Sequence, residues 1–238
     1  MSRLDIFGID GLPEIRPGAD LAGMIAQAAA AGDGTALADG DVVVVTQKIV
    51  SKAEDQLVAI DPTDPLSHKP LVERESVRIL RRRGELIISE TKHGFICANA
   101  GIDLSNVEQG YAALLPEDSD RSARRIRDGL KGKAGVEVGV IVSDTFGRTW
   151  RRGVTDVAIG CAGIAAIVDL RGTNDALGRE MQVTEVALAD EIACAAELVM
   201  GKSTGIPVAV VRGLDASWFR TSSIKDEMIR KPEEDLFR

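Results

Sequence analysis

The chain has 238 residues, enough for one large domain or two small ones with a sizeable core. Hydrophobic residues make up 45% and charged residues 28%, a balance that excludes a mainly disordered chain. Aromatic residues make up only 3%, which argues against a base-stacking platform for single-stranded nucleic acid. The formal charge of −8 argues against a general nucleic-acid or anionic-membrane binder. An anionic substrate would therefore need metal ions or local clusters of Lys and Arg to receive it.

Neither a membrane span nor a disulfide framework is indicated. No apolar run approaches the roughly 20 residues of a membrane span, and Asp5 interrupts the start of the chain where a signal peptide would need an apolar core. Cys97, Cys161 and Cys194 are odd in number, lie far apart and form no CxxC pair. We expect them to be small core residues of a protein in the reducing cytoplasm.

The first half of the chain alternates predicted strands and helices. A short strand around 4–9 and the loop 11–15 precede an Ala-rich helix over 19–31 that ends at Gly32. The next elements, in order, are a buried strand over 42–50 that becomes polar at 46–48, a short helix or turn at 51–54, a helix near 71–83 that ends in the basic run 81–83, extended segments at 85–89 and 94–98, and a polar loop over 100–107.

The second half begins with a basic helix over 121–131 and a strand over 136–142 that runs directly into Ser143-Asp144-Thr145. Then follow a strand, turn and strand within 154–170, a long helix over 181–200 stopped by Gly201, a strand over 206–211, and a charged tail whose Leu236 and Phe237 pack on the body or on a partner. Few pairs resemble clean βαβ units, so we predict an α+β fold of mixed sheets with flanking helices. The least periodic stretch predicts a subdomain boundary near 110–120.

Common nucleotide and metal motifs fail here. The segment AELVMGKS at 196–203 resembles the end of a P-loop, but Ala196 stands where the motif needs Gly, and helix, loop and strand follow in the reverse order. The loop over 201–205 could still contact phosphates through backbone N–H groups. There is no GxGxxG and no HExxH, and His68 and His93 are the only histidines, which disfavours a histidine metal site or a Ser-His-Asp triad.

Two acidic clusters remain. Asp103 stands with Ser105 and Asn106 in the polar loop, and Asp144-Thr145 stands at the end of the strand over 136–142, where sheet proteins usually place ligands. If they meet, the two carboxylates would repel unless a divalent cation lies between them, and hard oxygen ligands suit Mg²⁺ or Mn²⁺ bound together with substrate phosphates. The alternative is that these acids cap helices or form Asx turns.

A basic cluster follows the second acidic one. Arg148, Arg151 and Arg152 are interleaved with Trp150, and arginine forks suit phosphate or carboxylate, although a solvated charged loop is an equal alternative. Lys52, behind a buried strand, could reach a nucleotide phosphate or simply lie on the surface.

Several segments taken together resemble one known family. They are GLPEI (11–15), DVVVVTQKIVSKAE (41–54), HGFICANAGIDLSNV (93–107), SDTFGRTWRRGVTDVAIG (143–160), GIPVAVVRG (205–213) and the closing RKPEEDLFR. In this order they resemble the F420-0:γ-glutamyl ligase family, over nearly the whole chain.

The resemblance implies an α+β fold particular to this family, neither Rossmann nor P-loop, with two intertwined subdomains and a single ligase domain over residues 1–238. It implies a cytoplasmic homodimer that uses GTP to join L-glutamate to the terminal carboxylate of F420-0 through an acyl phosphate, with further γ-linked glutamates as an extension. The implied cofactors are Mg²⁺ or Mn²⁺, two per site, and K⁺; neither nucleic acid nor a membrane is an expected partner.

Carried over by position, the resemblance assigns site residues. GTP would be held by Leu12, Pro13, Glu14, Ile15, Gln47, Lys52 and Asn106, and by the loop of Met200, Gly201, Lys202, Ser203, Thr204, Gly205, Ile206 and Pro207. Asp103 and Asp144 would bind one metal ion and Thr145 a second. With Arg148, these two acids form the expected catalytic set, because phosphoryl transfer needs positioning and charge neutralisation rather than a covalent nucleophile.

Two positions depart from the family pattern. Gln47 stands where many members have Ser, and Lys202 stands where archaeal members tend to have Gln or Glu reaching the second metal. A protonated lysine cannot be a ligand, which puts the second metal site in question. Two other functions stay open at this point: a metal-dependent nucleotide phosphohydrolase that uses the same acids, and a non-catalytic GTP-binding module.

Overall fold

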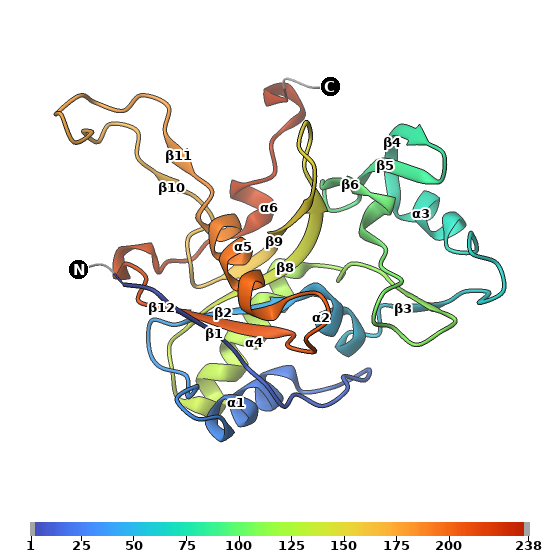
Figure 1. Cartoon of the computed structure of the whole chain (residues 1–238). Helices are drawn as coiled ribbons and strands as arrows, with labels where there is room; N and C mark the ends of the chain where they lie inside the picture. The colour runs from blue at the N-terminus through green and yellow to red at the C-terminus, as the bar shows by residue number, and fades with distance from the viewer. Residues whose placement is uncertain (1–2, 236–238) are drawn as a thin grey trace.

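The computed structural model describes residues 3–235, and its centre is a five-stranded mixed sheet. Its strands in spatial order are β1 (Asp5–Gly8), β12 (Val208–Arg212), β2 (Val42–Thr46), β8 (Gly139–Gly147) and β9 (Val154–Ala162) (Figure 1). Only β2 and β8 pair in parallel, and the other neighbours are antiparallel. The predicted α+β class with mixed sheets is confirmed.

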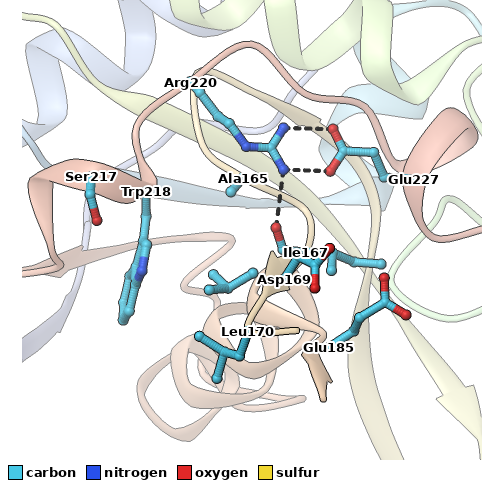
Figure 2. Close-up of a pocket in the computed structure, with 10 residues that line it drawn as sticks. Ala165, Ile167, Asp169, Leu170, Glu185, Ser217, Trp218, Arg220 and Glu227 are labelled. Atoms are coloured by element: carbon cyan, nitrogen blue, oxygen red, sulfur yellow. Dashed lines mark hydrogen bonds and ion pairs between the residues drawn. The ribbon is translucent and has the colours of Figure 1, made fainter. Parts of the chain in front are cut away.

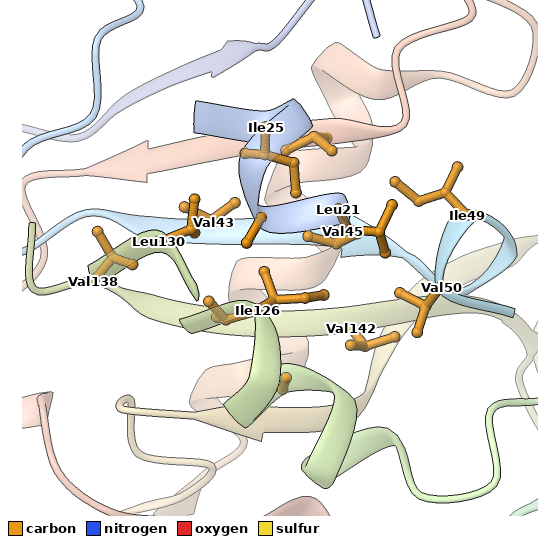
Figure 3. Packing of buried hydrophobic residues seen from close by; sticks show 14 of the residues in the cluster. Leu21, Ile25, Val43, Val45, Ile49, Val50, Ile126, Leu130, Val138 and Val142 are labelled. Carbon is orange, nitrogen blue, oxygen red and sulfur yellow. The ribbon is translucent and has the colours of Figure 1, made fainter. Parts of the chain in front are cut away.

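Helices cover both faces of this sheet. Along β2, Val43 and Val45 face α1 (Leu21–Ala31) and α4 (Ser119–Ala134), whereas the alternate valines face α5 (Leu188–Met200). Figure 3 shows the first of these layers, with side chains of α1 and α4 against the sheet. Because both faces are buried, β2 is a continuous run of β-branched residues rather than an alternating one.

The chain between β2 and α4 forms a polar annex beside the sheet (Figure 1). It begins with α2 (Gln47–Ala53) and contains α3 (Lys69–Glu75), the sheet of β4 (Ser76–Arg83), β5 (Leu86–Thr91) and β6 (Ile96–Ala98), the pair β3 (Leu57–Ala59) and β7 (Tyr111–Ala113), and the 3₁₀ turn η1 (Asn99–Gly101). The remaining elements are an arm built on β10 (Val168–Asp169) and β11 (Glu185–Val186), then η2 (Ala216–Trp218), α6 (Ile224–Glu227) and η3 (Pro232–Glu234).

The helix predicted near 71–83 is wrong in its second half. The helix ends at Glu75, and Ser76–Arg83 is the edge strand β4, paired antiparallel with β5 across a turn at Gly84, which has φ +55°. Helix-favouring Leu and Arg residues are overridden by this pairing, and β-branched residues at 77 and 79 suit a strand. The basic run 81–83 therefore lies on a sheet edge, not at a helix end.

Three other boundaries also differ from the prediction. The buried strand ends at Thr46, and Gln47 begins α2, so Lys52 lies on a helix. The strand predicted to stop at 142 continues as β8 to Gly147, because it pairs with β9 along its whole length. The long helix begins at Leu188 rather than at 181, since the preceding residues belong to the arm and its connection.

Other elements match the sequence closely. Asp20 accepts a hydrogen bond from the Gly23 N–H at the start of α1, and Gly32 ends that helix as expected. The strand, turn and strand predicted within 154–170 are β9, a turn at Gly163 and β10. Within residues 3–235, no helix is both long and apolar enough to cross a bilayer. The predicted packing of Leu236 and Phe237 falls outside the described residues.

Candidate active-site cleft

A cleft of about 870 Å³ lies where the carboxyl ends of the parallel strands β2 and β8 meet. Loops from the annex, from residues 12–15 and from residues 201–207 close it on the other sides. This is the edge at which open sheets with parallel neighbours usually place their ligands. The cleft gathers these predicted residues: Leu12, Pro13, Glu14, Ile15, Gln47, Lys52, Asp103, Asn106, Asp144, Thr145, Gly201, Lys202, Ser203, Gly205, Ile206 and Pro207.

Asp103 is paired with a lysine that the sequence did not single out. Lys48, at the start of α2, places Nζ 2.8 Å from Asp103 Oδ2 and 2.9 Å from the Ser105 hydroxyl. Ser105 also donates both its N–H and its hydroxyl to Asp103 Oδ1, at 2.7 and 2.8 Å. Burial raises the pKa of Asp103, but the hydrogen bonds from Lys48 and Ser105 outweigh it and hold that pKa below its usual range. Asp103 is therefore ionised and fixed in place.

Asp144 is the carboxylate without an ion-pair partner. Within residues 3–235, no Lys or Arg forms a salt bridge with Asp144, and its Oδ1 accepts a hydrogen bond from the Thr145 N–H at 2.8 Å. Burial, with the negative charges of Asp103 and Asp156, raises the pKa of Asp144 to about 7. A cation beside Asp144 would offset the cost of burying its negative charge near two other acids, so the site fits a positively charged ligand.

A second cluster surrounds Lys202, which lies beyond the end of α5. Its Nζ contacts Thr145 Oγ1 and Asp156 Oδ1 at 2.6 Å each and Glu197 Oε1 at 2.9 Å. Burial lowers the pKa of Lys202, but the hydrogen bonds to Asp156 and Glu197 outweigh it and raise that pKa above its usual value. Thr145 also donates its hydroxyl to Asp156 Oδ1 at 2.8 Å. Thr145 is thus engaged with protein groups on both sides.

The residues expected to hold the nucleotide line the opposite wall. Lys52 is buried and its Nζ lies 2.5 Å from Glu14 Oε1, which joins α2 to the loop 12–15. Gln47 faces inward: its amide nitrogen donates to the Leu114 carbonyl at 2.9 Å and to the Ser51 hydroxyl at 2.5 Å. Asn106 has φ +51°, a conformation that Asn tolerates better than most residues. Asn106 therefore suits the left-handed turn that this loop makes where it lines the cleft.

Three predicted residues do not line the cleft. Met200, the last residue of α5, is fully buried in the core between that helix and the sheet. Thr204 donates its hydroxyl to the Met200 carbonyl. Arg148 is exposed at the tip of the β8–β9 hairpin, where its Nη2 donates to the Arg152 carbonyl at 3.0 Å. Trp150, at the same tip, is 88% exposed and has φ +65°. The hairpin therefore presents the basic cluster to solvent next to Phe146, Gly147 and Val154, which do line the cleft.

Sequence reasoning missed Lys48, Asp156 and Glu197. Lys48 fell inside the strand predicted over 42–50. The polar residues at 46–48 could have indicated that the strand ends there and that Lys48 lies at its carboxyl end, where ligands usually bind. Asp156 is 3% exposed and lies within the apolar run of β9, where an acid demands a partner. A further acid, Asp190 on α5, accepts a hydrogen bond from the Ala158 N–H at 2.8 Å and so ties α5 to β9.

The cleft offers few protein ligands for a metal ion. Among residues 3–235, no three His, Cys, Asp or Glu side chains are gathered closely enough to hold an ion by themselves. Asp103 and Asp144 nevertheless fit one divalent cation, because they face the same cleft and the charge of Asp103 helps to raise the pKa of Asp144. Mg²⁺ and Mn²⁺ commonly take only one or two carboxylates and complete their shells with water and substrate phosphate. Thr145 does not fit as a ligand in this arrangement, since Lys202 contacts its hydroxyl oxygen.

A second cavity of about 540 Å³ lies at the base of the arm, away from this cleft (Figure 2). Its charged groups are already paired: Arg220 forms two contacts of 2.7 Å with Glu227, and Arg220 Nη2 also donates to the Ile167 carbonyl at 3.0 Å. The guanidinium of Arg220 is therefore already engaged by groups of the chain itself.

The chain is an α+β protein with a cleft lined by carboxylates and lysines at the carboxyl ends of adjacent parallel strands. The profile of the family described as F420-0:Gamma-glutamyl ligase matches residues 10–213. The chain belongs to the F420-0:γ-glutamyl ligase family.

Curated relatives agree over nearly the whole length. The chain is 40% identical to a coenzyme F420:L-glutamate ligase of Methanothermobacter thermautotrophicus, over 99% of each chain. It is 42% identical to the enzyme of the same name from Methanopyrus kandleri, over 100% of each chain. A Methanococcus maripaludis relative with that name is 40% identical over 85% of this chain and 86% of its own.

Proposed function

We propose that this ligase uses GTP to form an amide between L-glutamate and the terminal carboxylate of F420-0, in coenzyme F420 biosynthesis, and that it can add further γ-linked glutamates. The observation that supports this most directly is the meeting of Asp103 and Asp144 in one cleft with Lys48 and Lys52. The names of the relatives supply the amino acid and the cofactor class.

A carboxylate is a poor acyl donor and must first be activated. In the proposed first step, an acceptor carboxylate oxygen bonds to the γ-phosphorus of GTP, the bond from that phosphorus to the β-bridging oxygen breaks, and GDP leaves. In the second step, the amine nitrogen of glutamate bonds to the acyl carbon, inorganic phosphate leaves, and the amine loses a proton. Both steps need positioning and charge neutralisation, which lysines and carboxylate-bound cations provide without a protein nucleophile.

Residues on the two walls divide this work. Lys52, oriented by Glu14, and the backbone of the loop 201–207 are proposed to bind GTP phosphates, and Asn106 to contact the nucleotide. Lys48 keeps Asp103 ionised and oriented. Arg148, at the exposed hairpin tip, is proposed to receive an anionic group of the acceptor.

Asp103 and Asp144 are the residues that would hold Mg²⁺ or Mn²⁺. Such an ion, when bound, neutralises phosphate charge and polarises the transferring phosphoryl group. We also propose a K⁺ requirement, a cytoplasmic location and a homodimer, which follow from the resemblance of the sequence segments to the family.

The test measures GDP release and product mass with GTP, Mn²⁺, glutamate and F420-0, omitting each in turn. We expect GDP release over many turnovers only when both acceptor and glutamate are present, and a product heavier by one or more glutamyl units. Omitting both organic substrates gives the control: equal GDP release without them identifies a phosphohydrolase and overturns the proposal. Tight GTP binding with no turnover under any condition identifies a binding module and overturns it equally.

A further inference from the structure

Lys202 ends in a cage of oxygen atoms. Its ammonium nitrogen contacts Asp156 Oδ1 and Thr145 Oγ1 at 2.6 Å and Glu197 Oε1 at 2.9 Å. The three acceptors come from β8, β9 and the last turn of α5, which are separate in sequence. Two carboxylates and a hydroxyl are a ligand set that hard cations prefer, and here a protein ammonium lies among them.

The charges of this cage show why a cation is needed there. Asp156 is 3% exposed, and an ionised carboxylate so buried is costly without a compensating charge. The Thr145 hydroxyl donates a hydrogen bond to Asp156 and accepts one from Lys202, so its oxygen is engaged on both sides. The contacts of 2.6–2.9 Å are typical of charged N–H···O bonds and longer than the ~2.1 Å of a Mg–O bond.

The chain after α5 fixes this lysine in the cleft. Gly201 ends the helix with φ +59°, a value that suits glycine, and the Thr204 hydroxyl binds back to the Met200 carbonyl. The two residues between them, Lys202 and Ser203, both line the cleft. About half of the Lys202 side chain stays exposed there, so the ammonium is also open to a ligand.

Asp144 provides the contrast within the same cleft. It lies beside Thr145 on β8, yet within residues 3–235 it forms no ion pair with Lys or Arg. In the Lys202 cluster the ammonium contacts both carboxylates. At the neighbouring position, Lys48 contacts Asp103 and, within residues 3–235, no Lys or Arg forms an ion pair with Asp144. The carboxylate of Asp144 is therefore left for a cation from solution.

We propose that the ammonium of Lys202 takes the place of a second divalent cation, so that this enzyme binds one Mg²⁺ or Mn²⁺ per site, between Asp103 and Asp144, and uses Lys202 as a fixed positive charge facing the nucleotide phosphates. The inference rests on the proposed function for the nucleotide and extends it with a cation count. Thr145 is then a positioning residue for Lys202, not a metal ligand.

The test counts bound Mn²⁺ by electron paramagnetic resonance, with and without a non-hydrolysable GTP analogue. The wild-type protein, Lys202→Met and Lys202→Gln are compared, with Lys133→Gln as the matched control, because Lys133 pairs with Asp20 on the far-lying α1–α4 surface. We expect one Mn²⁺ per chain for the wild type and the control. Both Lys202 variants should bind two, since Asp156 and Glu197 then share an unfilled cage.

Two results would overturn the inference: two Mn²⁺ per chain in the wild type, or one in folded Lys202 variants. The wild-type count decides the question even where a variant unfolds in a thermal melt. The two proposals can fail separately. Absence of GTP-dependent ligation in the wild type would reject the proposed function, and an increase from one Mn²⁺ to two on loss of Lys202 would still support the cation count.

Discussion

The charge of Asp144 costs the folded chain stability, and its loss should cost function. Burial and neighbouring acids raise its pKa from an ordinary 3.8 to about 7. The folded chain then holds this proton more tightly than the unfolded chain, so stability is lost as the pH rises from 3.8 to about 7 and the loss is constant above. In EDTA at about pH 8, Asp144→Asn should raise the free energy of unfolding by about 2–4 kcal/mol, measured by urea denaturation.

The same variant should lose ligation by about 100-fold or more, because it removes the charge that we propose to hold a cation. Repeating the denaturation below about pH 3 provides the control, since Asp144 is then largely protonated in both the folded and the unfolded chain and the stabilisation should vanish. An Asp144→Asn protein with full activity would show that Asp144 has only a structural role and would remove it from the site.

A buried ion pair offers a second prediction for single residues. Arg212 contacts both carboxylate oxygens of Asp41 at 2.7 Å, and Asp41 is fully buried. Arg212→Met leaves that carboxylate unpaired and should lower the free energy of unfolding by about 3–5 kcal/mol, as read from denaturant midpoints.

Arg171→Met is the matched control for this pair. Arg171 makes similar two-point contacts of 2.7 and 2.9 Å with Asp169, but both side chains are about half exposed. We expect its loss to cost less than about 1 kcal/mol. If Arg212→Met and Arg171→Met lowered the free energy of unfolding equally, burial of Asp41 would not explain the strength of its ion pair.

Among the site residues, those predicted from the sequence share a recognisable context. Asp103 follows an apolar segment in a polar loop, and Asp144 follows a buried strand, so local pattern was enough to select both. Lys48 and Asp156 were missed because their roles depend on which strand pairs with which. Asp156 meets Thr145 only through the register of β8 with β9, which no local pattern encodes.

At the level of elements, α4 approaches α1 through a glycine. A Cβ added at Gly129 would lie 2.5 Å from the Ala22 Cβ, whereas one added at Gly132, in the same helix, would meet nothing within 4 Å. Both substitutions to Ala gain helix propensity of about 1 kcal/mol. Gly132→Ala should therefore raise the melting temperature, and Gly129→Ala should lower it by a net loss of about 1–3 kcal/mol from overpacking.

Gly132→Ala is the internal control, as it makes the same chemical change in the same helix. Calorimetry of both proteins checks the prediction. A Gly129→Ala protein as stable as Gly132→Ala would mean that α1 moves away from α4 at little cost and that their close approach is not essential.

Elements with a strong period were predictable, and those set by pairing were not. The helix α1 has an N-cap Asp20, an apolar stripe and a terminal glycine, all visible in the sequence. By contrast, β4 reads as helical by composition and becomes a strand because Gly84 turns the chain back onto β5. Likewise, α2 begins at Gln47, directly after the last residue of β2, Thr46.

At the scale of the whole molecule, the arm stands out from the body (Figure 1). Its strands β10 and β11 have two residues each, and a short isolated hairpin is marginal in water. Leu177 and Val183 on it are 94% and 84% exposed. A second copy of the chain would cover these side chains and stabilise the arm, which agrees with the homodimer expected for this family. The arm is therefore the surface at which we expect the two copies to meet.

The double variant Leu177→Asp/Val183→Asp tests this assignment. Two carboxylates buried without partners in a subunit contact are strongly unfavourable. We therefore expect light scattering over a range of concentrations to show a monomer for the variant and a dimer for the wild type. Leu198→Asp is the matched control, because Leu198 is 83% exposed on α5 and not on the arm, and it should stay dimeric. A double variant that remains a dimer would move the interface to another face, and a monomeric wild type would reject the homodimer itself.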